Sequence, residues 1–313
     1  MFKKLSNKLA KKVSARIIND FPLLSSYNKI ESIKLLSNGK ILSNHLKSHS
    51  CDSASLHSYE FKIFSEYGDD GIIQFLIQNI KYKNQSFIEF GVEDFLESNC
   101  RFLMMNNNFK GFVIDGSKEN INRLKNFDWF WRYDLQCEHS FITRDNIDSL
   151  ITKSGLEDIA LLHIDLDGND YWIFEKMDLS KINPAILILE YNSVFGDERT
   201  ISIPYQADFV RTNYHYSNLC FGASLPALNY LAEKRGYSLI GCNSAGNNSY
   251  FVRNDLLSDN IKKISVKEAY VESKFRESRD QNGNLSYLRG KERIEAIRGL
   301  KVINVLTNQI EEI

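Results

Sequence analysis

Two short apolar segments, each ending near an acidic residue and a glycine, constrain the fold of this chain most strongly. The first reads FIEFGVE over residues 87–93, the second reads GFVIDG over residues 111–116, and a helical pattern follows each. They are typical of the first two βα units of a nucleotide-binding α/β sheet. In that setting Gly91 lets the backbone approach a ligand closely, and Asp115, at the tip of the second strand, accepts hydrogen bonds from ribose hydroxyls. The pair therefore indicates an adenosine-containing cofactor.

The same alternation continues along the chain and favours a doubly wound, mostly parallel, Rossmann-like α/β sheet. Strands are expected at 86–91, 111–115, 138–143, 159–165 and 185–191. Helices are expected at 94–107, 117–126, 145–154, 169–178 and 224–236. Two further strands, at 237–241 and 248–253, follow each other without a helix between them. They predict a hairpin that puts one antiparallel strand at the edge of the sheet.

The composition is that of an ordinary globular protein and argues against several classes. The formal net charge is −1, so no nucleic-acid partner is expected. No apolar run is long enough to span a bilayer, and no signal-peptide pattern is expected. The five cysteines are scattered and form no CxxC pair, which suits reduced thiols in the cytoplasm better than disulfides or a zinc site.

Three regions are expected: a basic helical extension over residues 1–58, a central α/β domain over residues 59–260, and a helical C-terminal extension over residues 261–313. Within the first, residues 1–20 show a basic amphipathic pattern. Such a helix lies on an anionic membrane surface, or packs against its own subunit or a partner. Peripheral contact with the inner face of a membrane and homo-oligomerisation therefore both stay open. Residues 21–58 predict weaker helical segments separated by breaks rich in Ser and Asn.

The glycine content of the first loop narrows the choice of cofactor. No glycine follows Gly91 as far as Asn99, so the GxGxxG pattern of dinucleotide-binding proteins is missing. A pyrophosphate needs close backbone approach at several glycines, which disfavours NAD, NADP and FAD. S-adenosylmethionine carries no phosphate and needs only one such approach. Glu89 would then meet its ammonium group directly or through water.

A group of carboxylates follows the fourth expected strand. Asp165, Asp167 and Asp170 lie within six residues, and Glu190 ends the fifth expected strand. Because neighbouring strand ends lie about 5 Å apart, Asp165 or Asp167 could share one divalent cation with Glu190. All-oxygen ligands favour Mg²⁺, Ca²⁺ or Mn²⁺ over zinc. The alternative is structural, with Asp167 capping the next helix and Asp165 bonding backbone amides.

Deprotonation of an alcohol would need a general base, and three residues are candidates. Asp170 lies one helical turn into the site. His163 lies within an apolar strand, so a core role is the simpler interpretation. His215 belongs to a long polar loop, of a kind that often binds substrate. The tyrosines of this loop that could stack on sugar rings are Tyr205, Tyr214 and Tyr216.

Taken in order, these residues resemble the FkbM-like methyltransferases, a family of class I S-adenosylmethionine-dependent enzymes, many of them found with polysaccharide or natural-product pathways. The resemblance covers about residues 59–255 and rests on an ordered set rather than on one motif. The matching segments are SEYGDDGII at 65–73, FIEFG at 87–91, IDG at 114–116, HIDLDGND at 163–170, LEYN at 189–192, FGASL at 221–225 and GY at 236–237.

The resemblance implies a class I methyltransferase fold for the central domain and a cofactor site for S-adenosylmethionine. Its residues would be Glu89, Gly91, Asp115, Gly116 and Asp165. Asp134 or a neighbour would approach the adenine.

The resemblance also implies which residues bind a metal and which act as the general base. Metal-binding acids are implied at Asp167 and Glu190, holding Mg²⁺ or another divalent cation. Related macrolide-sugar O-methyltransferases carry a histidine where this chain has Asp170, so Asp170, or His215 from the loop, would act as base, with Asp167 beside them.

The expected activity is O-methylation of a sugar or glycan, such as a surface polysaccharide, in the cytoplasm or at the inner face of the membrane. Methylation of another small metabolite is one alternative. A degenerate methyltransferase fold that serves as a binding module is the other.

Overall fold

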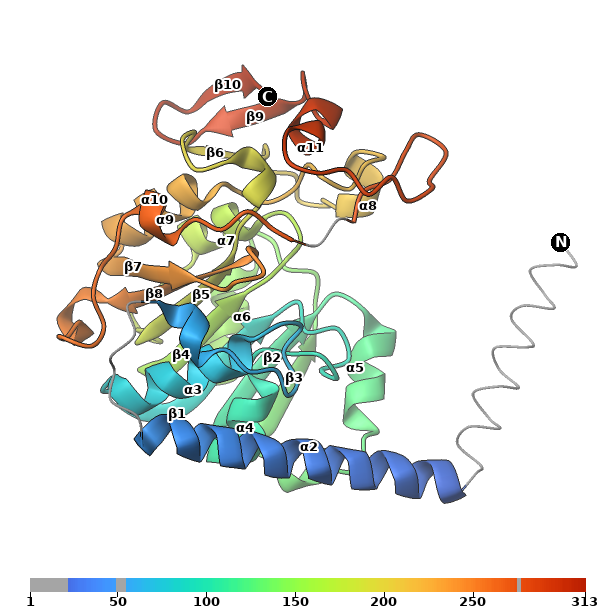
Figure 1. Cartoon of the computed structure of the whole chain (residues 1–313), viewed down its shortest axis with the longest axis vertical. Helices are drawn as coiled ribbons and strands as arrows, with labels where there is room; N and C mark the ends of the chain where they lie inside the picture. The colour runs from blue at the N-terminus through green and yellow to red at the C-terminus, as the bar shows by residue number, and fades with distance from the viewer. Residues whose placement is uncertain (1–21, 49–54, 275–276) are drawn as a thin grey trace, which may run out of the picture.

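The computed structural model describes residues 22–48, 55–274 and 277–313, and its centre is a seven-stranded sheet with helices on both faces (Figure 1). The strand order is β3–β2–β1–β4–β5–β8–β7. The amphipathic pattern at residues 1–20 lies outside the described residues. The strand bounds are β1 Asn84–Phe90, β2 Lys110–Asp115, β3 Leu135–His139, β4 Ile159–Ile164, β5 Ile186–Glu190, β7 Tyr237–Cys242 and β8 Asn248–Arg253.

The sheet is mostly parallel and has the antiparallel hairpin at its edge, as the sequence predicts. β1 to β5 run parallel to one another. β8 pairs antiparallel with both β5 and β7, so it is the one strand of this sheet that runs against the others. Because the strand order reverses between β1 and β4, a crevice forms at the carboxyl ends of these strands, where open α/β sheets bind their ligands.

β3 lies earlier in the chain than the expected 138–143. It is an edge strand of five residues, and Leu135 is its one buried residue. The apolar pattern of this strand is therefore weak. The apolar residues that suggested a later strand, Phe141 and Ile142, lie after it instead. Phe141 is exposed, and Ile142 joins the core beside the following helix. The residues after His139 consequently form a loop at the carboxyl edge of the sheet.

Two apolar layers hold helices on the two faces of the sheet. One layer contains side chains of α3 and α4 together with Leu124 of α5. The other contains side chains of α6, α7 and α9. The bounds of these helices are α3 Asp69–Asn79, α4 Arg101–Asn107, α5 Lys118–Lys125, α6 Ile147–Ser154, α7 Asp170–Lys176 and α9 Leu225–Lys234.

α4 is shorter than the helix expected at 94–107. In the loop before it, Glu93 and Phe95 have φ angles of 47° and 63°. These left-handed conformations are incompatible with a continuous right-handed helix. The loop passes over the carboxyl end of β1 instead, and this brings its backbone to the crevice.

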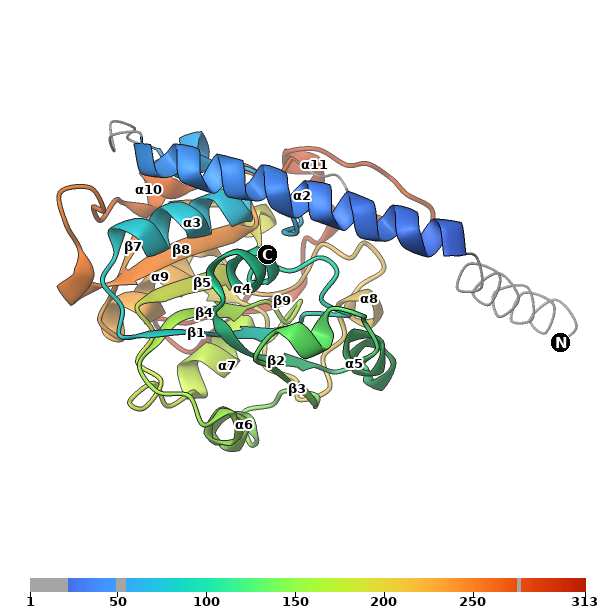
Figure 2. The ribbon, with the colours of Figure 1, turned by 90° about the horizontal axis from the view of Figure 1, so that it is seen from below.

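α2 (Pro22–Ser48) is one continuous helix of 27 residues rather than the broken segments that the sequence predicts. It lies across α3 and α4 (Figure 2). Gly39 permits this contact, since a Cβ there would lie 2.4 Å from the ring of Phe102. Ser43 Oγ donates a hydrogen bond to Gln74 Oε1 at 2.7 Å. Tertiary packing thus outweighs the modest helix propensity of Ser and Asn.

None of the helices in the described ranges has both the length and the apolarity needed to cross a membrane.

The C-terminal region 261–313 contains two short helices, α10 and α11, and also a hairpin that the sequence did not predict. The hairpin β9–β10 pairs with β6 in a second, three-stranded sheet, which lies at the opposite end of the molecule from α2 (Figure 1). Its strands are short and of mixed polarity, so they show little alternation. The bounds are β6 Ile201–Ser202, α8 Arg211–Tyr214, α10 Val266–Ala269, α11 Lys291–Ala296, β9 Lys301–Asn304 and β10 Gln309–Glu312.

The acidic pair that begins α3 anchors the chain to the sheet. Asp69 Oδ1 accepts hydrogen bonds from Asn243 Nδ2 at 3.1 Å, from Asn248 Nδ2 at 3.0 Å and from the hydroxyl of Tyr250. Asp70 Oδ2 accepts from three consecutive backbone amides of the preceding segment. Both aspartates are buried, so this motif is structural, and it holds the β7–β8 turn at the carboxyl edge.

Candidate functional site

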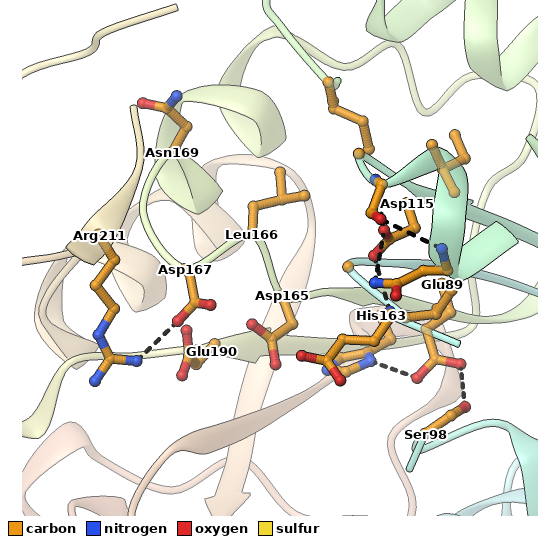
Figure 3. Close-up of a pocket in the computed structure, with 18 of the residues that line it drawn as sticks. Glu89, Ser98, Asp115, His163, Asp165, Leu166, Asp167, Asn169, Glu190 and Arg211 are labelled. Atoms are coloured by element: carbon orange, nitrogen blue, oxygen red, sulfur yellow. Dashed lines mark hydrogen bonds and ion pairs between the residues drawn. The ribbon is translucent and has the colours of Figure 1, made fainter. Parts of the chain in front are cut away.

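A cavity of about 740 Å³ lies at the carboxyl edge of the sheet, over the crevice between β1 and β4 (Figure 3). Its volume is in the range of pockets that enclose small ligands. The five residues predicted to bind a cofactor come from the ends of β1, β2 and β4, and all of them line this cavity. They are Glu89, Gly91, Asp115, Gly116 and Asp165.

Carboxyl groups dominate the wall of the cavity. Among the described residues nine carboxyl side chains line it, against the one guanidinium of Arg211. The nine are Glu66, Glu89, Glu93, Glu97, Asp115, Asp165, Asp167, Glu190 and Glu277. A concave site with this excess of acids attracts a cationic ligand and repels phosphate groups.

Gly91 is required by the packing of the protein itself. Its φ is +70°, and a Cβ at this position would lie 1.7 Å from the backbone oxygen of Asp165. The amide of Gly91 donates to the carbonyl of Ile114 at 3.0 Å. The loop after β1, the end of β2 and the loop after β4 therefore meet at this glycine, which lines the cavity.

Replacing Gly91 with alanine is expected to lower the free energy of unfolding by about 2 kcal/mol or more, because alanine would be strained at this φ and would displace the backbone of Asp165. Gly116→Ala is the matched control, since its Cβ would only touch the ring of Phe141 at 3.4 Å. Denaturant unfolding of the two variants measures the difference. Equal losses of stability would contradict the role assigned to Gly91.

Asp115 joins two loops through hydrogen bonds, and its carboxylate still has an acceptor position for a ligand. Its Oδ2 accepts from the amide of Glu93 at 2.8 Å, and its Oδ1 accepts from the amide of Ser117 at 2.7 Å. Asn120 Nδ2 makes a longer contact with Oδ1 at 3.4 Å. A carboxylate has about four acceptor positions, so one position on Oδ2 stays available. The geometry is therefore compatible with the predicted hydrogen bond to a ribose hydroxyl.

Glu89 has all its acceptor positions occupied. Oε2 accepts from Ser98 Oγ at 2.6 Å and from the amide of Cys100 at 3.3 Å. Oε1 accepts from the amide of Asn99 at 2.9 Å and contacts His163 Nδ1 at 3.0 Å. Direct contact with a ligand ammonium would require one of these bonds to break. Glu89 thus holds the loop before α4 and contributes its negative charge to the cavity.

His163 is the buried partner of Glu89. Its Nδ1 contacts Glu89 Oε1 at 3.0 Å, and its Nε2 lies 3.2 Å from Asn99 Nδ2. Burial alone lowers the pKa of His163, but the hydrogen bond and charge of Glu89 outweigh it and raise that pKa above its ordinary value. The core role that the sequence favours for His163 agrees with these contacts.

Asp165, Asp170 and Glu190 form a compact acidic cluster. One carboxylate oxygen of each lies within 4.8 Å of the others. Burial, and after it the charge of Asp167, raises the pKa of Asp165 to about 8. Burial raises the pKa of Glu190 well above its ordinary value, and the charges of Asp165 and Asp167 act in the same direction. A positive group close to the cluster would relieve this repulsion.

Asp167 forms an ion pair with an arginine, whereas the sequence suggested that it shares a cation with Glu190. Its Oδ1 forms an ion pair with Arg211 Nη1 at 2.8 Å (Figure 3). Arg211 is fixed in turn, because its Nε donates to the carbonyl of Asn218 at 2.9 Å and its guanidinium lies 3.8 Å from the ring centre of Phe221. Within the described residues, the carboxylates that lie close to Glu190 in this cluster are those of Asp165 and Asp170. A metal held by Asp167 and Glu190 stays a prediction.

Of the three residues predicted to be catalytic, only Asp167 lines the cavity. Asp170 is fully buried, and its two oxygens accept from the amides of Leu166 at 2.8 Å and Gly168 at 3.0 Å. It therefore shapes the loop after β4. His215 lies outside the cavity wall, and its Nδ1 is 2.8 Å from Ser217 Oγ. Asp170 and His215 are therefore not part of the cavity wall, and their catalytic roles stay a prediction.

Asp134 was expected near an adenine, but it lies at the opposite edge of the sheet. It precedes β3, its side chain is 64% exposed, and its carboxylate is 3.6 Å from Lys110 Nζ. The residues that follow β3 and line the cavity are Ser140, Phe141 and Ile142. Because Asp134 precedes the strand, it lies at the amino edge of the sheet, whereas the cavity lies at the carboxyl edge.

Several residues of the cavity wall were missed. Asn247 and Asn248 line it because β8 begins opposite the end of β5, with Asn248 in register with Glu190. The predicted hairpin could have located them. Arg211 had no comparable signal, because it begins the short helix α8, 44 residues beyond Asp167.

Comparisons with known proteins identify no family for the chain. No protein-family model matches it, and no significant match was found among curated proteins. Among matching solved structures, the bifunctional kinase-methyltransferase WbdD aligns over 56% of this chain and 36% of its own, at 15% identity and a TM-score of 0.32. A SAM dependent methyltransferase from Aquifex aeolicus aligns over 55% of this chain and 84% of its own, at 10% identity and a TM-score of 0.30.

The alignment thus spans about a third of WbdD. Both TM-scores are low, and membership of the FkbM-like group stays a prediction.

Proposed function

We propose that this protein is an S-adenosylmethionine-dependent O-methyltransferase acting on a hydroxyl of a sugar or glycan. The observation that carries the proposal is the acidic cavity at the carboxyl edge of the sheet, with Asp115 at the tip of β2. S-adenosylmethionine has a sulfonium and an ammonium group against one carboxylate, and it has no phosphate. Its net positive charge suits nine carboxyl groups, which would repel a dinucleotide.

In the proposed complex the ribose hydroxyls donate to Asp115, and the adenine lies toward Ser140 and Ile142. The methionine end lies toward Asp165, and its positive groups offset part of the repulsion between the carboxylates that line the cavity. This orientation follows from the order of the strands, because β3, β2, β1, β4 and β5 present their carboxyl ends in a row.

The transfer itself needs few groups. An acceptor oxygen attacks the methyl carbon in line with the carbon–sulfur bond, that bond breaks, and sulfur leaves as a neutral thioether. The acceptor hydroxyl loses its proton to a carboxylate. Asp167 is the best placed, because it lines the cavity and its side chain is 61% exposed. Arg211, held against Asp167, keeps that side chain oriented.

A divalent cation is the second part of the proposal. Asp165 and Glu190, with Asp170 behind them, fit such an ion, because the three offer oxygens within 4.8 Å of one another and hard cations prefer oxygen ligands. A bound Mg²⁺ would lower the pKa of the acceptor hydroxyl. Asp170 would be the weakest contributor, since both its oxygens already accept from backbone amides.

Calorimetric titration of the purified protein tests the proposal. S-adenosylmethionine is expected to bind about tenfold more tightly than S-adenosylhomocysteine at low salt, because the product has lost one positive charge. The difference should shrink as salt screens the cavity. The same titrations with and without Mg²⁺ report whether a metal is linked to cofactor binding.

Absence of binding by either compound to the folded protein would end the proposal and favour the alternative of a degenerate fold that acts as a binding module. Tighter binding of the product would instead contradict the electrostatic argument, while leaving a cofactor site.

A further inference from the structure

A smaller cavity of about 340 Å³ adjoins the acidic one. Most of its lining residues, among them Asp167, Phe209 and Arg211, also line the acidic cavity, so the smaller space is a side compartment of the larger one. Thr212 and Asn218 line only the smaller one. The volume is at the low end of small-molecule pockets. It suits a single ring-sized group rather than a second cofactor.

The wall of the smaller cavity combines apolar surface with a few polar groups. Phe141 comes from the loop after β3, and Phe209 comes from the loop before α8. Thr212 and Asn218 add a hydroxyl and an amide. An aromatic wall packs against the C–H face of a ring, while polar groups bond its hydroxyls, so the lining matches a polyhydroxylated ring better than a lipid tail.

The charges of this cavity disfavour an anionic ligand. Arg211 is the one cationic side chain among its described lining residues, and its guanidinium is already paired with Asp167 at 2.8 Å. The charges of Glu190 and Asp167 hold the pKa of Arg211 above its ordinary value against the effect of burial, so these carboxylates lie close to it. Glu277 adds a further carboxylate to the wall. No unpaired positive group is left there for a carboxylate or phosphate.

We infer that the smaller cavity is the acceptor subsite, and that it selects a neutral sugar ring over an acidic one. The inference rests on the proposed function, because it places the acceptor hydroxyl beside Asp167 at the boundary of the two cavities. A uronic acid or a sugar phosphate is excluded by the carboxyl groups on both sides of that boundary.

Saturation-transfer NMR on the full chain tests this inference. The probes are methyl glycosides of glucose, galactose and mannose, with methyl glucuronide as the anionic counterpart. At least one neutral glycoside is expected to bind, and methyl glucuronide is not. Thr212→Trp should fill the cavity and weaken glycoside binding about tenfold or more. It should leave the affinity for S-adenosylmethionine unchanged, because Thr212 does not line the larger cavity.

Asn213→Trp is the matched control. Asn213 is exposed on the same helix turn but lines neither cavity, so this variant should bind glycosides like the wild type. No binding of any neutral glycoside, equal binding of the glucuronide, or unchanged binding in Thr212→Trp would each overturn the inference.

The two proposals fail separately in these experiments. Glycoside binding without any S-adenosylmethionine binding would refute methyl transfer but keep a sugar site. Cofactor binding without glycoside binding would refute the sugar subsite alone.

Discussion

Replacing Asp115 with asparagine is expected to weaken S-adenosylmethionine binding by roughly tenfold to 150-fold, because a hydrogen bond to a charged group contributes about 1.5–3 kcal/mol. Asparagine keeps the shape of the side chain but loses the negative charge and one acceptor group. The amide of Glu93 or of Ser117 would then face an NH₂ group instead of an oxygen. Calorimetry measures the change in affinity.

Circular dichroism and thermal unfolding show whether the Asp115 variant is folded. Asp134→Asn is the matched control, because Asp134 is exposed and lies at the far edge of the sheet. The control should bind the cofactor like the wild type. Unchanged affinity in a folded Asp115→Asn protein would remove Asp115 from the site.

Replacing Glu190 with glutamine is expected to stabilise the protein above neutral pH and to slow methyl transfer about 100-fold. Burial and the neighbouring charges of Asp165 and Asp167 raise the pKa of Glu190 in the folded state. A carboxyl group with a raised folded pKa stabilises the fold below its unfolded pKa, and this contribution is lost as the pH rises toward the folded value. Glutamine carries no proton that can be lost.

The pH window follows from these shifts. Stability of the wild type should fall as the pH rises from about 4, where Asp and Glu ionise in unfolded chains, to about 8, the pKa that Asp165 reaches in the fold. The Glu190→Gln variant should show a smaller fall, so that at pH 8 it unfolds about 2–4 °C higher for each 1 kcal/mol gained. Melting curves at pH 5, 6.5 and 8 give the comparison.

Glu233→Gln serves as the control for the Glu190 variant. Glu233 is 41% exposed and pairs with Lys263 at the surface, so its removal should produce no gain of stability at high pH. A Glu190→Gln protein whose stability follows the wild-type pH profile would show that the cluster is not strained. A fully active variant would remove Glu190 from the mechanism.

The regular elements of the central sheet were predictable because each has a strong local signal. β1, β2, β4 and β5 are buried strands flanked by turns, and their apolar runs mark them within two residues. β3 and the β9–β10 hairpin were misplaced or missed, since edge strands and short strands bury too little surface to show alternation. α2 was expected to be broken because its support comes from α3 and α4, which local propensity does not report.

The candidate site likewise has a part that the sequence predicts and a part that it does not. The sequence alone determined that Glu89, Gly91, Asp115 and Asp165 meet at one edge, because parallel strands present all their carboxyl ends there. Only the tertiary structure decided which of these groups face a ligand and which hold the protein together.

Glu89 and Asp170 direct their oxygens to backbone amides, and Arg211 crosses 44 positions of sequence to pair with Asp167. Such hydrogen-bond partners lie on loops, and the paths of these loops depend on long-range packing. Periodicity in a sequence encodes the strands and helices that carry such loops, whereas the directions of the side chains on the loops are set by contacts formed only in the folded chain.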